Sequence, residues 1–105
     1  MVAEPSYVTL APGVPKALHF TNHALGTAML PDPLLGIDKP VMRLTFIVDE
    51  EDGRPVAKTY SITSSEHRAY FERFLGEKAY ANYTWIITRR GDGFRTKYSV
   101  TQIPR

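Results

Sequence analysis

Apolar and polar residues alternate along much of this sequence, which is typical of β-strands with one buried face. The clearest case is the segment 41–49, VMRLTFIVD, in which every second residue from Met42 to Val48 is apolar. Asp52-Gly53 follows and suits a tight hairpin turn, because it tolerates the positive φ values that such turns need. The same reasoning predicts five main strands, at 14–21, 41–49, 55–63, 82–89 and 94–101.

One segment departs from this alternation and predicts a helix. Thr63 is the expected N-cap, and Glu66 three residues later completes a capping box. Residues at helical spacing then form one apolar stripe, namely His67, Tyr70, Phe71, Phe74 and Leu75. Gly76 stands where a helix commonly ends. We therefore expect a helix over this segment that packs on the core.

Two further segments are predicted to be irregular. Asn22–Pro40 contains three prolines and two glycines, and its apolar residues follow no clean period. We expect it to be a long loop packed on the rest of the fold. Residues 1–13 are expected to be a loose N-terminal arm with a short strand at Tyr7–Leu10, and residues 14–105 to be one domain.

The predicted order is strand, long loop, strand, acidic turn, strand, helix, strand, basic turn, strand. This is the order of the OB-fold, so we expect a mainly β fold: a five-stranded OB-fold-like barrel with one helix between strands 3 and 4.

Composition narrows the function classes. The 105 residues include no cysteine, which excludes disulfides and thiolate metal sites and favours a reducing compartment. No secretory signal and no apolar stretch of about 20 residues is present, so we expect a soluble, cytoplasmic protein away from membranes. The net charge is only +2, but it is unevenly distributed. Residues 1–76 hold seven Lys and Arg against nine Asp and Glu, and residues 77–105 hold six against two. The basic excess therefore lies in the last quarter of the chain.

Motifs of enzymes are missing from the sequence. It has no phosphate-binding glycine loop, no Gly-x-Ser-x-Gly and no His-Glu-x-x-His, so we expect no enzyme activity and no cofactor. His19 and His23 are spaced like helical metal ligands but straddle the end of a predicted strand, which favours structural histidines. The acidic run Asp49–Asp52 could hold a divalent cation, but a solvated hairpin tip is the favoured reading.

The hairpin at residues 82–98 combines cations with aromatic residues, the two features that single-stranded nucleic acid needs for phosphate contacts and base stacking. Arg43, Lys58 and Tyr60 would lie on the binding face of the barrel formed by strands 2 and 3. The predicted phosphate contacts are Arg43, Lys58, Arg89, Arg90, Arg95 and Lys97, and the stacking candidates are Tyr60, Tyr83, Trp85 and Phe94. For Trp85 and Phe94 a place in the core is an open alternative.

The run from Asp52 to Ser64, DGRPVAKTYSITS, and the run from Tyr83 to Val100, with Trp85, resemble small OB-fold single-stranded DNA-binding-like proteins of phages, archaea and archaeal viruses. The resemblance covers roughly residues 40–101. It implies that a shared hairpin comprises Arg89, Gly91, Gly93, Thr96 and Tyr98, with the glycines shaping its turn.

The leading hypothesis is a non-enzymatic binder of single-stranded DNA, with RNA as an alternative ligand. A second hypothesis is a protein-interaction module, including a homodimer, that uses the apolar Leu30–Ile37 segment. A third is a hydrolase or nuclease that uses Asp49–Asp52 with a metal ion.

Overall fold

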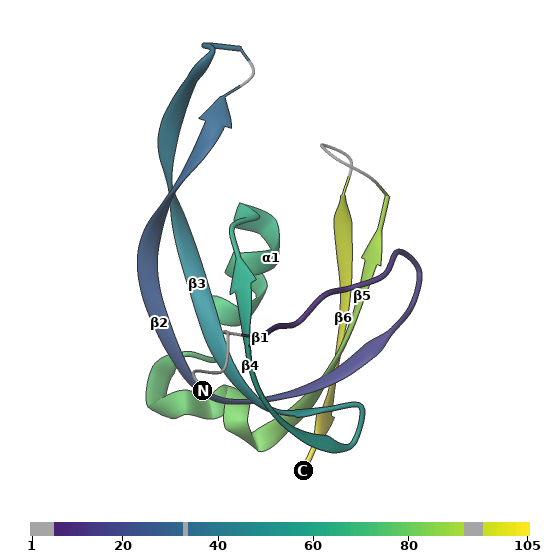
Figure 1. Ribbon diagram of the computed structural model, residues 1–105. Coiled ribbons are helices and arrows are strands. Elements are labelled where there is room, and N and C mark those ends of the chain that lie inside the picture. Colours follow the sequence, from purple (N-terminus) through teal and green to yellow (C-terminus); the bar gives the residue numbers. More distant parts are fainter. Residues whose placement is uncertain (1–5, 33, 92–95) are drawn as a thin grey trace, which may run out of the picture.

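The computed structural model describes residues 6–32, 34–91 and 96–105. These residues form one six-stranded sheet with an α-helix and a 3-10 helix (Figure 1). The elements are β1 (Ser6–Tyr7), β2 (Lys16–Asp32), β3 (Ile37–Glu51), β4 (Arg54–Ile62), α1 (Ser65–Glu72), η1 (Gly76–Asn82), β5 (Tyr83–Arg90) and β6 (Lys97–Pro104). The predicted mainly β class is confirmed, and a helix does lie between the predicted third and fourth strands.

The strand order in the sheet is β1-β4-β3-β2-β5-β6. All neighbouring pairs are antiparallel except β1 and β4, which are parallel. The predicted five-stranded OB-fold-like barrel is not what is found: the sheet has six strands and does not close on itself. Within the described residues, the two edge strands β1 and β6 do not pair with each other, so the sheet stays open.

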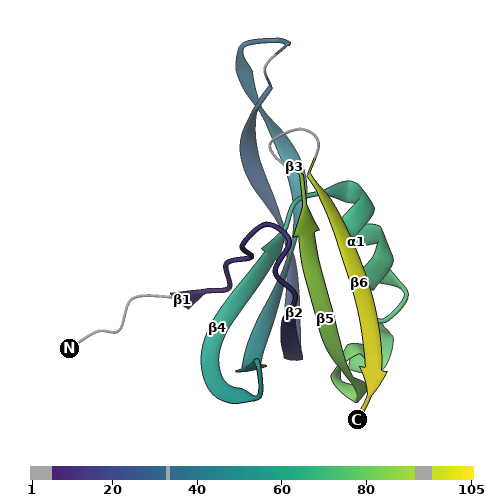
Figure 2. The same cartoon turned by 90° about the vertical axis from the view of Figure 1, so that its right-hand side faces the viewer.

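The described part of the N-terminal arm connects two regions of the sheet. Ser6 and Tyr7 pair with β4, and the Val8 amide donates to the Thr59 carbonyl at 2.9 Å. Further along, the Gly13 amide donates to the carbonyl of Arg89 on β5 at 2.8 Å. Figure 2 shows this segment running from β4 towards β5. Residues 6–13 therefore lie over the open side of the sheet.

The predicted loop at Asn22–Pro40 is wrong. Residues 22–32 and 37–40 instead continue β2 and β3 as a long antiparallel pair that extends beyond the rest of the sheet (Figure 1, upper left). We call the paired segments 25–32 and 37–44, from Leu25 opposite Leu44 to Asp32 opposite Ile37, the ribbon. Its prolines misled the prediction. A two-stranded ribbon has two free edges, where a proline that lacks an N–H removes no ladder bond.

The core is built from the inner face of the curved sheet, to which the N-terminal segment, α1 and η1 add buried residues. Leu44, Phe46 and Val48 are each fully buried, whereas Ile47 between them is 43% exposed, as the alternation predicts. Aromatic rings dominate this core, and those of Phe20 and Phe46 stack with centroids 4.1 Å apart. The other large buried aromatic residues are Tyr60 of β4, Phe71 of α1, Tyr80 of η1 and Trp85 of β5.

The helix is shorter than predicted and has a different cap. Ser64, still in extended conformation, is the N-cap, and its hydroxyl accepts a hydrogen bond from the His67 amide at 3.3 Å. The α-helix ends at Glu72, and Gly76 begins the 3-10 helix instead of following the α-helix directly. Across the described residues, no helix has both the length and the apolar character needed to cross a membrane.

Candidate nucleic-acid interface

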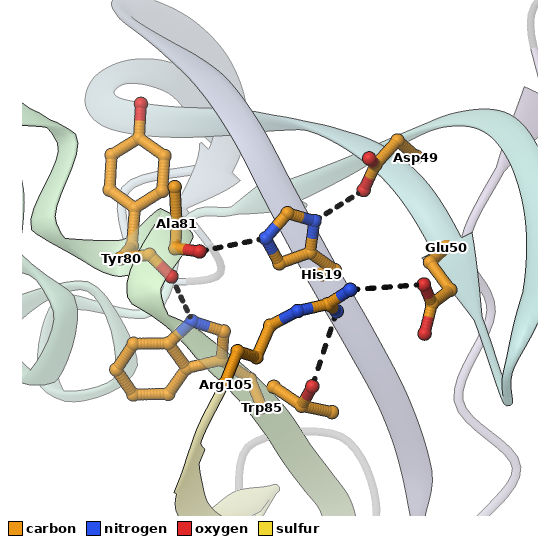
Figure 3. Close-up of polar contacts among 8 residues, drawn as sticks. His19, Asp49, Glu50, Tyr80, Ala81, Trp85 and Arg105 are labelled. Carbon is orange, nitrogen blue, oxygen red and sulfur yellow. Dashed lines mark hydrogen bonds and ion pairs between the residues drawn. The ribbon is translucent and has the colours of Figure 1, made fainter.

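Two of the four predicted stacking residues lie inside the protein. Trp85 is fully buried, and its indole N–H donates to the Tyr80 carbonyl at 3.0 Å (Figure 3). Tyr60 is 6% exposed, and its hydroxyl is hydrogen-bonded to Nε2 of His67 at 2.7 Å. Neither ring offers a face to a base, so both are removed from the stacking candidates. The alternation of the sequence assigned each residue to one face of its strand, and in both cases that face is buried in the core.

Of the other two stacking candidates, Tyr83 and Phe94, only Tyr83 lies among the described residues. Tyr83 is half-buried, and its ring packs edge-on against Phe74 with centroids 5.8 Å apart. Phe94 lies outside the described residues, and so does the predicted phosphate contact Arg95.

The predicted cations fall into two groups. Lys58 and Lys97 are already paired with carboxylates, at 2.7 Å from Glu51 and 3.1 Å from Glu66. A second group, Arg43, Arg89 and Arg90, has no carboxylate partner in the part of the chain that the structure describes. Within the described residues, therefore, an external anion would not have to displace a carboxylate from any of these three arginines.

Arg89 occupies an unusual position. By alternation with Trp85 and Ile87, its side chain is on the inner face of β5, at the end where the sheet stays open. Its Nε is buried and has no hydrogen-bond partner among the described residues. An unpaired donor on a buried charged group is costly, so an anion that reached it would be bound favourably.

A pocket surrounds this guanidinium. We call it the seam pocket; it has a volume of about 350 Å³ and is lined by Val8, Thr9, Leu10, Tyr60, Ser61, Arg89 and Tyr98. Burial, and secondarily the neighbouring Tyr98, raises the pKa of the Tyr60 hydroxyl, which therefore stays protonated. The seam pocket thus combines one cation, neutral hydroxyl groups and apolar walls.

The outer face of β1, β4 and β3 lies beside the seam pocket. Tyr7 on β1 is 63% exposed and pairs with Thr59, which in turn is opposite the exposed Ile47 of β3. The hydroxyl groups of Thr45 and Ser61 lie 3.3 Å apart on the same face. We call Tyr7, Thr45, Ile47, Thr59 and Ser61, together with Arg43, the outer-face patch.

Tyr7 was missed as a site residue by the sequence analysis. The short strand predicted at Tyr7–Leu10 was the available signal, since strand alternation separates Tyr7 from the buried Val8. That signal could not show that β1 would align with β4. Arg43, by contrast, was predicted and does lie exposed on this face, where it is opposite Gly26.

Arg90 and Lys97 lie on the opposite face of the β5–β6 hairpin from Arg89. They are direct cross-strand partners, and both are exposed. The Nε of Arg90 donates to the Ser99 hydroxyl at 3.0 Å. The basic hairpin therefore divides its cations between two faces instead of presenting them together.

The acidic run Asp49–Asp52 does not form a metal centre. Each carboxylate has a different partner. Asp49 contacts His19 at 2.6 Å, and Glu50 contacts Arg105 at 3.3 Å (Figure 3). Glu51 contacts Lys16 and Lys58 at 3.2 and 2.7 Å, and Asp52 accepts a hydrogen bond from the Ala17 amide at 2.9 Å. Among the described residues, no group of three or more His, Cys, Asp or Glu could hold a metal ion. The run instead fastens the β3–β4 turn to β2 and to the C-terminal end of the chain.

The partners of this run also reduce its repulsion of phosphate. Burial alone would raise the pKa of Glu51, but the hydrogen bonds and charges of Lys58 and Lys16 more than reverse this and hold it below its ordinary value. Glu51 is therefore ionised and neutralised by two lysines. His19 is held between Asp49 and the Ala81 carbonyl, and His23 is bonded to the Tyr80 hydroxyl at 2.7 Å, so both have protein partners (Figure 3 shows His19).

Comparison of this chain with protein-family models, with curated proteins and with solved structures found no match. Functional evidence therefore comes from its own residues and their geometry.

Proposed function

We propose that the chain is an OB-fold-like, non-enzymatic protein that binds single-stranded nucleic acid, DNA in preference to RNA, without strict sequence preference. The order in which the strands pair supports the OB-fold-like assignment. The OB-fold is a five-stranded, partly open barrel, and β2 to β6 follow its strand order with a helix after the third of them. Oligonucleotides bind such barrels on strands 2 and 3, between the loops that join strands 1–2 and 4–5. These correspond here to β3 and β4, the ribbon, and the β5–β6 hairpin.

The observation that carries the proposal is the composition of the outer-face patch and its border. An exposed aromatic ring, Tyr7, and an exposed aliphatic side chain, Ile47, lie beside the hydroxyl pair of Thr45 and Ser61. Arg43 belongs to the patch itself, and Arg89 lines the neighbouring seam pocket; neither has a carboxylate partner among the described residues. Flat rings that stack on bases and cations that contact phosphates are what sequence-tolerant binding requires.

This placement differs from the one predicted from sequence. Stacking is assigned to Tyr7 in place of the buried Tyr60 and Trp85, and the phosphate contacts are assigned to Arg43 and Arg89. Lys58 and Lys97 contribute less, because each would have to leave a carboxylate. Arg90 extends the basic surface on the other face of the hairpin.

The test is the fluorescence anisotropy of a labelled oligo-dT titrated with wild-type protein and variants over a range of salt concentrations. Arg43→Gln and Arg89→Gln should each lower the slope of log affinity against log salt by about 0.7, the contribution of one phosphate on a single strand. Tyr7→Ala should cost about 1–3 kcal/mol, the contribution of one stacked base.

Arg73→Gln is the matched control. Arg73 is an exposed cation at the end of α1 that lies over the rings of Tyr70 and Phe74, away from the outer-face patch. The Arg73→Gln substitution removes one positive charge, as Arg43→Gln does, and should leave the affinity for oligo-dT and its salt dependence unchanged. The proposal fails if wild-type protein does not bind at low salt, or if Arg73→Gln weakens binding as much as Arg43→Gln. A duplex and an RNA competitor then rank the three ligands.

A further inference from the structure

The two faces of the ribbon differ in chemistry. Residues opposite each other in an antiparallel pair share a face, and Leu25 is opposite the buried Leu44. One face of the ribbon therefore continues the core side of the sheet beyond the core. We call it the apolar face; it comprises Leu25, Thr27, Met29, Pro31, Asp38, Pro40 and Met42. The other face continues the outer-face patch and is the one with basic residues: it carries Lys39, Arg43 and Asp32 beside the apolar residues Ala28, Leu30, Ile37 and Val41.

The apolar face is uncovered. Leu25, Met29 and Met42 are 55%, 59% and 49% exposed. Among the described residues, β2 pairs with β5 only over Lys16–Leu18, and β3 pairs with β4 only from Leu44 onward. Apart from Leu44, the residues of the ribbon therefore pair only with each other. A two-stranded hairpin without a packed face is marginally stable in water. Contiguous exposed apolar surface of this kind marks an interaction site.

The charges of this face favour a second copy of the chain over nucleic acid. The apolar face contains no Lys or Arg, and its one charged residue, Asp38, lies near the tip. At the base of the ribbon, one terminal nitrogen of Arg68 of α1 donates to the Met42 carbonyl at 3.5 Å, and its Nε is paired with Glu72 at 3.1 Å. Its second terminal nitrogen has no partner among the described residues and is the group left for another carboxylate. If two ribbons pack antiparallel, the tip of each reaches the base of the other, so Asp38 of one copy approaches Arg68 of the other. A two-fold interface is self-complementary in this way.

The interface area that a stable dimer needs indicates that the tip of the ribbon also takes part in the contact. Large aromatic side chains bury about 150–250 Å² each, so three partly exposed aliphatic ones cannot supply the roughly 800 Å² per partner of a stable complex. Leu34 and Leu35 at the tip are 94% and 67% exposed and add to the surface. They belong to the Leu30–Ile37 segment for which the sequence predicted an interaction role.

We infer that two copies of this chain associate through the apolar faces of their ribbons, antiparallel about a two-fold axis. The inference does not depend on nucleic-acid binding, because the opposite face of each ribbon stays free. It leaves the outer-face patches of both copies accessible.

The test is sedimentation equilibrium of the full chain without nucleic acid, at about 5–200 µM, a range in which ordinary homodimers associate. Wild-type protein should sediment as a dimer of 11.9 kDa subunits. Leu25→Thr with Met29→Thr should weaken association about tenfold or more, since central apolar contacts dominate interface energetics. Threonine suits exposed strand positions, and circular dichroism checks that the variant keeps its fold.

Leu30→Thr is the matched control. Leu30 is 38% exposed on the opposite face of the same strand, so its replacement should leave the association constant unchanged. Charge reversal tests the orientation: Asp38→Arg and Arg68→Asp should each weaken the dimer, and the two together should restore it. A monomer across the whole range, an equal effect of Leu30→Thr, or no restoration by the double reversal would overturn the inference. A monomer that still binds oligo-dT would overturn it and leave the proposed function standing.

Discussion

Lowering the pH should destabilise this fold through one buried imidazole, that of His67. His67 is 5% exposed, and its Nε2 is hydrogen-bonded to the Tyr60 hydroxyl at 2.7 Å. The ring of Tyr98 stacks on it with centroids 4.1 Å apart. Burial lowers the pKa of His67 to about 4 from its ordinary 6.5. The charged groups beside it, Glu66 and Lys97, pair with each other at 3.1 Å on the rim of a cavity of about 170 Å³.

The direction in which stability changes with pH depends on whether the folded or the unfolded state binds the proton more readily. Unfolded chains take up a proton on this residue as the pH falls through 6.5, whereas the folded protein does so only near 4. The unfolded state therefore binds more protons between these values, and stability falls as the pH falls. The difference between the two pKa values corresponds to about 3.4 kcal/mol at most, and about 2 kcal/mol of it should be lost by pH 5.

The assay is urea unfolding of wild-type protein and His67→Gln at several pH values from 7.5 to 5. Glutamine has a similar length and can still exchange a hydrogen bond with Tyr60, but it does not titrate. The carboxylates titrate in both proteins and cancel in the difference. The unfolding free energy of the wild type should fall by about 2 kcal/mol relative to the variant between pH 7.5 and pH 5. Two curves that stay parallel would refute the reasoning, because they would show that the imidazole is not kept neutral by the fold.

Further predictions concern Trp85 and the acidic turn. Trp85 fluorescence should resist quenching by acrylamide and by bound oligonucleotide, because the ring is fully buried; strong quenching by either would show that the ring is accessible. Trp85→Phe should lower the unfolding free energy by about 2 kcal/mol in urea, since it removes the indole hydrogen bond to the Tyr80 carbonyl, which keeps only the Tyr83 amide as donor, and leaves part of the volume of a fully buried ring empty. Glu51→Gln should cost about 1 kcal/mol at neutral pH, because Lys16 and Lys58 are only 22% and 28% exposed and lose their common partner. Since the folded pKa of Glu51 lies below its ordinary 4.5, this contribution is present above about pH 4.5 and is lost as the pH falls further. Glu66→Gln, at a well-exposed ion pair, should change stability by less than about 0.5 kcal/mol and serves as control.

Local signals predicted several elements because their causes lie within a few residues. Asp52-Gly53 turns the chain between β3 and β4, and both residues have positive φ, as that turn chemistry requires. Alternation correctly separated Lys97 from Tyr98, which lie on opposite faces of β6. Helix capping was harder to place. Thr63 and Ser64 are both good caps, and only the length of β4 decides between them.

The candidate site was less predictable, because it depends on which segments become neighbours. Alternation shows that Trp85 and Arg89 share a face but not which parts of that face are covered. The distinction arises because α1 and η1 cover the end of the sheet near Trp85, while the end near Arg89 stays open. Tyr7 became a candidate only because β1 pairs with β4.

By itself, the order of residues determined the strands of the central hairpins, the helix that follows β4, and the side of each strand on which a residue lies. These properties depend on turn chemistry and on periods of two or 3.6 residues, which act over short stretches of chain. Tertiary structure alone decided that the sheet stays open, that the ribbon extends from it, and that Arg89 lines a pocket, with its buried Nε lacking a partner among the described residues. Those properties depend on contacts between segments far apart in the sequence, where burial and the partners of each charge are set by packing.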